Sequence, residues 1–415
     1  ILGGKTPPYG AGELLRFAEV VDRMMSGFAV LLFDNCRTAL AYSMQGFSFR
    51  AISESYTEEN VRSSREGFAE PLKVNMTLIR RRIKSGLLVF ESMKVGSVSN
   101  TDIALVYLKD RVSERLLEGI RKNLKGAKIE LVLESGFIQP FLSGKKRSLF
   151  SGVGHTERPD TLCGKLLEGR VGILVDGTPF ALITPYLFTE NFQSFDDYTN
   201  KPYYAGFIRI LKYAAFIVSI LLPGLYVAVI NFNPELIPLS LLYNISLAQL
   251  DTPLPLMYEA LFIHLVYEIV REAGLRLPRP VGHAVSLIGA LVVGEAAVNA
   301  GLIGSPMVMC VALTAISSFT IPMLYEPVTM LRFSFIIVGG LLGIVGLALG
   351  LGMLLCSICA VDSCGIPYTA PLSPYSPVFF RDGILRQSWR KLADNTVMLK
   401  ELHGAKGGGR DGEHK

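Results

Sequence analysis

The stretch GALVVGEAAVNAG, residues 289–301, consists of small and apolar residues apart from Glu295 and Asn299. In an α-helix these two polar residues stand one turn apart and share a face. A carboxylate at the centre of a bilayer costs about 2.5–3.5 kcal/mol, so it normally faces other helices or water. We therefore expect Glu295 and Asn299 either to join helices by hydrogen bonds or to line a polar pathway, and the sequence leaves both roles open.

Two further sets of residues belong with this pair. The next apolar segment contains TAISSFT, whose hydroxyl groups extend the list of candidates for a pore or a helix interface: Thr314, Ser317 and Ser318. Small residues follow one another at steps of four, three and four, and such a stripe lets a second helix approach closely: Ala290, Gly294, Ala297 and Gly301.

The sequence contains no recognisable motif for catalysis, a cofactor or a metal. The stretch GVGHTERPDTLCGK has glycines and a lysine, but not at the GxxxxGK[ST] spacing of a phosphate-binding loop. The five histidines are scattered, and the six cysteines do not form a disulfide set. The CxxC pair Cys356 and Cys359 ends an apolar segment, where cysteine behaves as a small hydrophobic residue. We expect no enzymatic activity and no cofactor.

A basic cluster in TLIRRRIK has two interpretations. It contains Arg80, Arg81, Arg82 and Lys84. Such a run can bind phosphate or nucleic acid, but a salt-bridged interface or a lipid-facing basic patch fits it better. We expect no nucleic-acid partner.

Composition divides the chain into a part exposed to water and a part embedded in a membrane. The mean hydropathy is +0.38 and the net charge is +5. Charged residues are frequent before residue 213 and sparse from 213 to 361, where three uncharged stretches occur at 213–234, 296–325 and 333–361. A helix needs roughly 20 apolar residues to cross the hydrocarbon layer. No signal peptide is expected, because the polar N-terminus, which begins with Ile1, has no apolar core after a basic start.

The membrane part, residues 207–361, is predicted to be a multi-pass helical domain with four or five segments. The candidate helices are 207–230, 254–273, 281–302, 307–325 and 333–361. The second carries Glu259, His264 and Glu268, so it either lies in the interface or crosses while facing protein. Four crossings place the basic tail, residues 362–415, in the cytoplasm, as the rule for positive charges favours, and five place it outside. Pro223, Pro306 and Pro322 predict kinked or broken spans whose freed backbone groups bond to neighbouring helices.

Residues 1–200 are predicted to form a soluble cytoplasmic domain of the α/β (α+β) class. Two segments, 18–43 and 159–185, each indicate a helix, a glycine, a strand, a turn led by aspartate and a second strand. This repetition predicts two related subdomains, about 1–95 and 101–200. Between the two segments, TDIALVYL and KIELVLES are predicted strands, and RVSERLLEGIRKNL is a predicted amphipathic helix.

The sequence resembles the A subunits of the GerA family of bacterial spore germination receptors from about residue 20 to 380. The runs that carry the resemblance include SREGFAEPLKVNMTLIRRRIK, TERPDTLCGKLLEGRVGILVDGTPFALITP, FQSFDDYTNKPYYAGFIRILKY, LPGLYVAV and REAGLRLPRPVGHAVSLIGALVVGEAAVNAGLI. These are long and specific matches rather than short patterns.

The resemblance implies a multi-pass subunit in the inner membrane of the spore. Such A subunits work with a transporter-like B subunit, which holds the nutrient, and with a lipoprotein C subunit. They are thought to form a ring whose helices make a nutrient-gated ion channel. The family usually has Gln where this chain has His283 and Glu295, so a ring of Glu295 side chains would favour cations and His283 would add pH sensitivity.

Three other functions remain as alternatives. A germination-amplifying paralogue shares the fold without needing a nutrient-binding partner, and neighbouring genes would separate it from a receptor subunit. A solute transporter often has inverted repeats in its membrane part, and none is visible in residues 207–361. A membrane enzyme is disfavoured because no catalytic set of residues is present.

Overall fold

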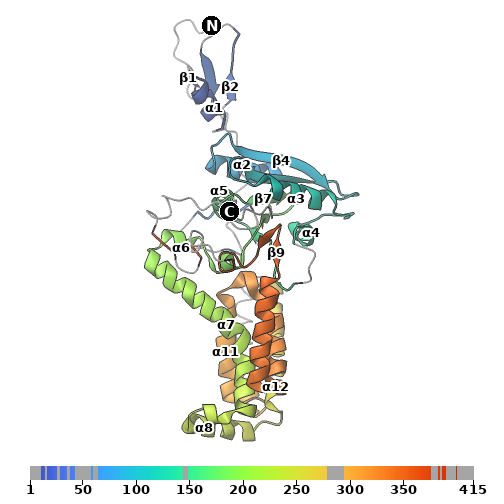
Figure 1. The fold of residues 1–415 in the computed structure, drawn as a ribbon, viewed down its shortest axis with the longest axis vertical. Coiled ribbons are helices and arrows are strands. Elements are labelled where there is room, and N and C mark those ends of the chain that lie inside the picture. The colour runs from blue at the N-terminus through green and yellow to red at the C-terminus, as the bar shows by residue number, and fades with distance from the viewer. Residues whose placement is uncertain are drawn as a thin grey trace, which may run out of the picture. The chain divides into compact units, whose positions relative to one another are not determined.

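The computed structural model describes residues 11–14, 16–25, 29–34, 38–42, 58, 64–143, 148–277, 294–374, 382–383, 386–388 and 399. The chain divides into two compact units (Figure 1). The first, the α/β unit, comprises residues 1–147, 151–205 and 360–415. The second, the helical unit, comprises residues 148–150 and 206–359.

The α/β unit begins with a small module of one helix and three strands. Its elements are β1 (Ala11–Leu14), α1 (Phe17–Met25), β2 (Ala29–Leu31) and β3 (Ala39–Tyr42). Both β1 and β2 pair antiparallel with β3. Val20, Ala39 and Ala41 form the buried core of the module. The predicted order of helix, strand, turn and strand is thus confirmed here.

A five-stranded antiparallel sheet forms the centre of the α/β unit, in the order β4-β5-β7-β8-β6. Its strands are β4 (Leu88–Val95), β5 (Thr101–Leu108), β6 (Gly154–Thr156), β7 (Val171–Val175) and β8 (Ala181–Thr184), and its helices are α2 (Leu72–Arg82), α3 (Glu114–Lys125), α4 (Gln139–Leu142) and α5 (Pro159–Leu167). The segment from α5 to β8 repeats the order seen in the small module, as predicted. The turn after β7 contains Gly177 at a φ of 90°, a conformation that glycine adopts without strain.

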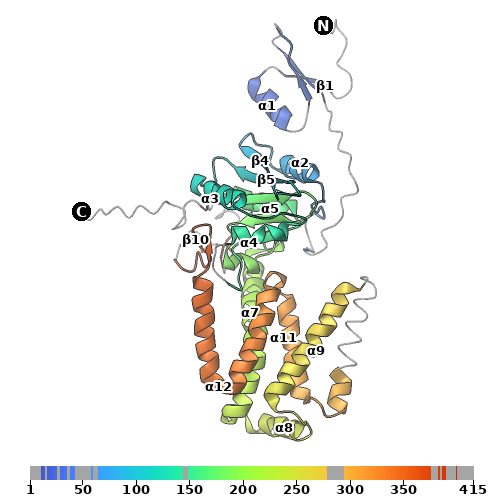
Figure 2. The same ribbon diagram turned by 90° about the vertical axis from the view of Figure 1, so that its right-hand side faces the viewer.

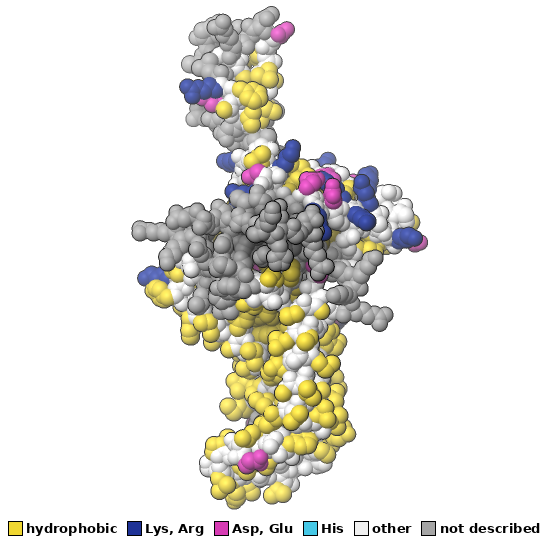
Figure 3. Space-filling model, viewed as in Figure 1, with side chains coloured by type: hydrophobic (Ala, Val, Ile, Leu, Met, Phe, Trp, Pro, Cys, Tyr) yellow, Lys and Arg dark blue, Asp and Glu magenta, His cyan; other side chains and the backbone are white. Residues whose placement is uncertain are grey.

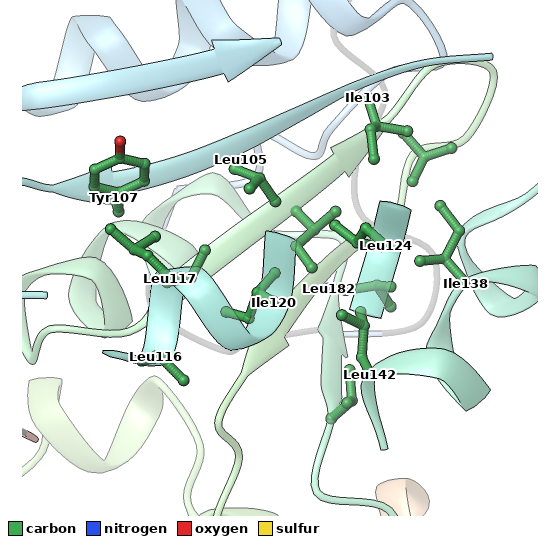
Figure 4. Packing of buried hydrophobic residues seen from close by; sticks show 14 of the residues in the cluster. Ile103, Leu105, Tyr107, Leu116, Leu117, Ile120, Leu124, Ile138, Leu142 and Leu182 are labelled. Carbon is green, nitrogen blue, oxygen red and sulfur yellow. The ribbon is translucent and has the colours of Figure 1, made fainter. Parts of the chain in front are cut away.

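Helices cover both faces of the sheet because β5 is apolar at every position from Ile103 onward. Successive side chains of a strand point to opposite faces. Ile103, Leu105 and Tyr107 therefore face one core with α3, while the intervening residues face a second core with α2 and α5. Figure 4 shows the first core, where the predicted apolar stripe of α3 packs on β5: Leu116, Leu117, Ile120 and Leu124.

Two predictions for this unit are wrong. A subdomain boundary near residue 95 does not exist, because β4 pairs with β5 along its whole length, from Leu88 opposite Leu108 to Val95 opposite Thr101. The stretch KIELVLES, residues 128–135, is not a strand. Its carbonyl groups bond instead to the turn between β4 and β5: the Val98 amide donates to Glu130 (2.9 Å) and the Thr101 hydroxyl donates to Val132 (2.8 Å).

Part of the C-terminal segment returns into the α/β unit. It forms a short hairpin of β9 (Asp362–Ser363) and β10 (Ile366–Pro367), and the Ser363 hydroxyl donates to the Gly152 carbonyl (2.5 Å). Ile366, Ala370 and Leu399 lie in the same core as α3. Part of the predicted basic tail, residues 362–415, therefore contributes apolar side chains to the folded domain.

The helical unit consists of long apolar helices and short connecting turns. Its elements are α7 (Pro202–Phe232), η3 (Pro234–Leu236), α8 (Leu239–Leu250), α9 (Leu256–Arg276), α11 (Ser305–Phe319), η4 (Pro322–Leu324) and α12 (Tyr325–Cys359). Two described helices are long and apolar enough to cross a membrane, Pro202–Phe232 and Pro322–Cys359. Helix α8 was not predicted from the sequence. Most of the predicted helix 281–302 lies outside the described residues, and only 294–299 are seen as helix.

The last apolar stretch is two helical arms rather than one crossing. Gly343 interrupts α12 with a φ of 63° and a ψ of −152°. A Cβ built on Gly350 would lie 3.2 Å from Phe335 Cε1, whereas residues 15 apart in a straight helix are about 22 Å apart. The chain therefore reverses at Gly343, and Figure 2 shows the two arms side by side. The prediction of a single span over 333–361 is wrong.

Candidate functional site in the helical unit

The predicted polar pair of Glu295 and Asn299 lies on the surface of the helical unit in the single chain. Both side chains are exposed. The two roles that the sequence left open, joining helices and lining a polar pathway, both stay predictions. The positions Ala290 and His283 lie outside the described residues.

The predicted hydroxyl groups of α11 bond to their own helix. Thr314 donates to the Cys310 carbonyl and Ser318 to the Ala315 carbonyl, both at 2.7 Å, and both side chains are buried. Ser317 is half-buried. Hydroxyl groups bonded in this way satisfy themselves locally and leave little capacity to line a polar surface.

The closest helix crossing is made by glycines outside the predicted stripe. A Cβ on Gly224 of α7 would lie 2.4 Å from the Phe335 carbonyl oxygen of α12, and one on Gly339 would lie 2.4 Å from the Gly224 carbonyl oxygen. At Gly294, by contrast, an added Cβ would meet only Val308, at 3.8 Å. Gly301 has a φ of 65° and lies at a turn, and Ala297 packs against the buried apolar cluster of α9 and α11.

A buried arginine repairs the hydrogen-bond gap that proline opens in α7. Pro223 lies inside the helix and has no backbone N–H, so the carbonyl of Ser219, four residues earlier, loses its helical partner. Arg332 of α12, whose exposed fraction is 0%, donates from Nε to that carbonyl at 3.0 Å. This is the arrangement that the sequence analysis predicted for prolines in this part of the chain.

Glu268 of α9 completes this arrangement. Its carboxylate accepts hydrogen bonds from Arg332 Nη1 (3.3 Å), Arg271 Nε (2.9 Å) and the Tyr325 hydroxyl (2.9 and 3.0 Å). The Arg271 guanidinium also lies over the Tyr325 ring, 4.0 Å from its centroid. We call the set of Ser219, Glu268, Arg271, Tyr325 and Arg332 the polar core.

Some polar groups in and beside the polar core have hydrogen-bond partners and others do not. Its two guanidinium groups share the carboxylate of Glu268. Arg271 has a second acid partner in the exposed Glu272, 3.8 Å from its Nη2, whereas Arg332 has no second acid partner within the described part of the chain. Arg332 Nη2 and the neighbouring Thr329 Oγ1 and His264 Nε2 have no hydrogen-bond partner within the described part of the chain. Leaving a buried polar group without a hydrogen-bond partner costs about 1–3 kcal/mol of folding free energy. A cluster that contains several such groups therefore contributes little to the stability of the helical unit.

Two further ionisable groups of α9, Glu259 and His264, also face protein, whereas Glu272 and Arg276 are exposed. Glu259 is buried and accepts a hydrogen bond from the Gly304 amide (2.8 Å), where a carboxylate favours the positive end of α11. His264 is buried and donates from Nδ1 to the Ala260 carbonyl (2.8 Å). The groups that the sequence singled out in this segment, Glu259, His264 and Glu268, thus turn toward protein. Whether α9 lies in the interface or crosses the membrane stays a prediction.

The contact between Arg332 and Glu268 was not predicted from the sequence. Two signals were present: Arg332 is the last charge before the apolar run 333–361, and Pro223 predicted an unpaired carbonyl in α7. Nothing in the sequence connects Arg332 with Ser219, 113 positions away, or with Glu268, 64 positions away.

The other features that resemble chemistry have structural roles. Arg81 and Arg82 pair with Glu66, and Arg80 lies over the Phe90 ring, 4.9 Å from its centroid. The basic run is therefore a salt-bridged interface. Among the described residues no group of three His, Cys, Asp or Glu side chains is arranged to hold a metal ion.

Comparison with known proteins decides the family. Residues 7–397 match the model of the Bacillus/Clostridium GerA spore germination protein family. The chain belongs to the GerA family.

Relatives of this GerA-family chain cover nearly its whole length. Spore germination protein KA of Bacillus subtilis (strain 168) is 42% identical over 388 residues, which are 93% of this chain and 71% of that protein. The uncharacterized membrane protein YfkQ of Bacillus subtilis (strain 168) is 38% identical, over 95% of this chain and 77% of that protein. Spore germination protein GerLA of Bacillus cereus is 35% identical, over 94% of this chain and 80% of that protein.

A solved structure is also similar in sequence to this GerA-family chain. It is the N-terminal domain of the A subunit of the Bacillus megaterium spore germinant receptor GerK3, which is 32% identical with a TM-score of 0.33. The match covers 43% of this chain and 63% of that one. The family and these relatives identify a spore germination receptor A subunit, and the apolar helices fit a membrane protein.

Proposed function

We propose that this chain is the ion-conducting membrane subunit of a nutrient-responsive germination receptor in the inner membrane of the spore. It acts by changing conformation rather than by catalysis. Its partners are a transporter-like B subunit that holds the nutrient, a lipoprotein C subunit and further copies of itself arranged in a ring.

The surface of the helical unit supports embedding in lipid. Large apolar side chains are exposed along each of its long helices, among them Ile217, Phe262, Ile316 and Leu349. Figure 3 shows hydrophobic side chains over most of the visible face of this unit. Monomeric soluble proteins rarely expose apolar patches larger than a few hundred Å², so the surrounding medium is the bilayer.

The return of the C-terminal segment supports an even number of crossings. The chain leaves the α/β unit after Ala205 and rejoins it at Ala360, and Ile366 and Ala370 are part of its core. Both ends of the helical unit are therefore on one side of the membrane, which we take to be the cytoplasmic side from the basic tail.

We count six crossings. Five are described helices, namely α7, α9, α11 and the two arms of α12, and the sixth is the predicted helix 281–302, which is counted from its sequence. The arms contain residues 325–342 and 344–359, about 27 and 24 Å at 1.5 Å per residue, close to the hydrocarbon thickness of about 30 Å. The 12 residues of α8 are too short to cross.

The observation that carries the proposal is the exposed Glu295–Asn299 pair on this apolar exterior. A carboxylate is costly against acyl chains, so in the assembled receptor it faces a neighbouring copy or a water-filled passage. A ring of such carboxylates favours cations.

The test is Glu295→Gln in spores that carry the whole receptor, with potassium release measured after a mixture of amino acids, glucose and inosine. We expect release to slow by at least fivefold and selectivity among monovalent cations to change, at an unchanged receptor level in the spore membrane. The matched control is Glu326→Gln, the same change at another exposed carboxylate of the helical unit. Unchanged rate and selectivity in the Glu295 variant would rule out the pore role.

A further inference from the structure

The polar core joins three helices at the point where one of them bends. Figure 1 shows that α7 changes direction part-way along its length, and a kink of this kind is expected at Pro223. Arg332 Nε supplies the hydrogen bond that Pro223 removes from the Ser219 carbonyl, and Nη1 of the same guanidinium donates to Glu268. One side chain of α12 therefore touches both the bend of α7 and the carboxylate of α9.

We propose that Arg332 is a positioning residue that sets the bend of α7 at Pro223 and couples it to α9 through Glu268. A movement of α9 that draws Glu268 away from Arg332 releases the guanidinium from Ser219 and lets α7 change its bend. This inference rests on the proposed function only in the step from the bend to ion release.

The geometry favours a coupling element over a rigid staple for two reasons. The first is that the guanidinium is only partly satisfied, since Nη2 has no partner within the described residues and the Nη1 contact with Glu268 is long, at 3.3 Å. The second is that Glu268 keeps Arg271 and Tyr325 as partners when Arg332 leaves. The Glu268 carboxylate therefore stays hydrogen-bonded after it loses its contact with Arg332.

Close packing next to the bend makes its angle matter to the neighbouring helix. Gly224 follows Pro223 directly and lies against the backbone of α12 at Phe335 and Gly339. Two backbones in such contact have no side chains between them that could absorb a displacement. A change of the bend in α7 is thus transmitted to α12 directly.

A double-mutant cycle between Pro223→Ala and Arg332→Met tests the contact. Alanine restores an N–H that can bond to the Ser219 carbonyl, so that carbonyl no longer needs Arg332. We expect Arg332→Met alone to reduce nutrient-triggered potassium release by at least tenfold, and the same change in the Pro223→Ala background to reduce it by less than threefold. Independent effects of the two substitutions would overturn the proposal.

Arg332→Lys separates positioning from charge. A lysine ammonium cannot reproduce the planar fork that reaches Ser219 and Glu268 together. We expect this variant to reach the spore membrane at the normal level but to need a several-fold higher nutrient concentration for a half-maximal response. Wild-type nutrient dependence would show that the charge alone matters.

Matched controls are available for both residues. Pro322→Ala changes a proline at the first turn of η4, where the missing N–H costs no helical bond. Arg276→Met removes an exposed arginine of α9, with an exposed side-chain fraction of 79%. Both controls should leave potassium release within twofold of wild type, and a larger effect would show that the assay does not resolve the polar core.

A distance measurement tests the bend without reference to function. Spin-labelled amino acids at the exposed positions Leu211 and Asn231 lie 20 residues apart, about 30 Å in a straight helix. In the purified full-length protein, Pro223→Ala should lengthen this distance toward that value. An unchanged distance would overturn the inference and leave the proposed function standing, whereas wild-type spores that release no potassium would instead contradict the proposed function.

Discussion

Each unit of this chain buries a cluster of charges, and the two clusters are built differently. In the α/β unit, Glu190 accepts hydrogen bonds from Lys165 Nζ (2.5 Å), Arg170 Nη1 (2.5 Å) and the Leu187 amide (2.8 Å), and Glu168 also contacts both cations. Two acids thus meet two bases. All these residues lie within one segment of 26 residues, 165–190, that includes β7 and β8.

The polar core of the helical unit draws its members from three separate helices. Its buried Arg332 has one acid partner, Glu268, while Arg271 pairs with Glu268 and with the exposed Glu272. Arg332 Nη2 lacks a partner among the described residues. A balanced local cluster, in which each cation has two acid partners, has one good arrangement. A cluster between separate helices, in which the buried Arg332 has one acid partner, loses less by rearranging. The comparison assigns a supporting role to the α/β unit and a moving role to the helical unit.

The largest expected effect on stability comes from breaking the balanced cluster. Glu190→Gln leaves Lys165 and Arg170 buried without their shared carboxylate. Removing one partner of a buried ion pair costs about 3–5 kcal/mol, so the thermal unfolding temperature of the full chain in detergent should fall by several degrees. The matched control is Glu118→Gln, at an exposed carboxylate. If the two variants lower the unfolding temperature equally, the buried cluster does not stabilise the α/β unit and the contrast between the two units is wrong.

The next effect is a dependence of the stability of the α/β unit on pH. Burial raises the pKa of Glu58 to about 7, although its hydrogen bond from Thr156 and the charge of Arg158 oppose the change. A carboxyl group whose folded-state pKa exceeds its unfolded value binds its proton more tightly when folded. Stability should therefore decrease as the pH rises from about 5 to 8, by at most about 3 kcal/mol.

Denaturant unfolding at several pH values measures this dependence. Glu58→Gln, which keeps the hydrogen-bonding shape without the charge, should flatten the curve over that range. If the wild type and the variant lose stability in parallel, Glu58 is not the group that titrates.

A smaller effect is expected at the glycine crossing of the helical unit. Gly339→Ala places a Cβ 2.4 Å from the Gly224 carbonyl oxygen and must push α7 and α12 apart. Overpacking of this kind costs about 1–3 kcal/mol. Gly352→Ala, in the second arm of α12, meets nothing within 4 Å and is the control. Equal thermal stability of the two variants would mean that the crossing is loose.

The smallest effect is expected at the basic run of α2. Glu66→Gln removes the partner of Arg81 and Arg82, and these side chains are partly exposed. Exposed ion pairs contribute about 0–1 kcal/mol. Thermal unfolding in high salt should show little difference from wild type, and a loss of several degrees would mean that this surface cluster stabilises the unit as strongly as the buried one.

The sequence predicted local structure well where one pattern dominated. The apolar stripe of α3, the buried strand β5 and the turn at Asp176 and Gly177 each followed from periodicity or turn chemistry. KIELVLES failed because its alternation suits a strand, whereas its carbonyl groups bond to the turn between β4 and β5 instead of to a strand ladder. The reversal at Gly343 could not be predicted, since several glycines in GGLLGIVGLALGLG could have served equally well.

The candidate site was predicted only in part. Glu295 was identified because a lone carboxylate in an apolar run is conspicuous, and the partner needed by the carbonyl before Pro223 was expected. The identity of that partner depends on the packing of α7 against α12, which arises from tertiary structure. Gly224 and Gly339 form the closest crossing of the described helices. Nothing in their sequence context distinguishes these two glycines from the many glycines of the apolar segments that make no such contact.

The most direct test of the contrast between the two units is hydrogen–deuterium exchange of the receptor in spore membranes. Exchange is compared before and after a nutrient mixture that triggers potassium release in the same spores. We predict changed exchange around Ser219–Pro223 in α7 and around Glu268 in α9, with no change in residues 165–190. Unchanged exchange in α7 and α9, or an equal change in residues 165–190, would contradict the account.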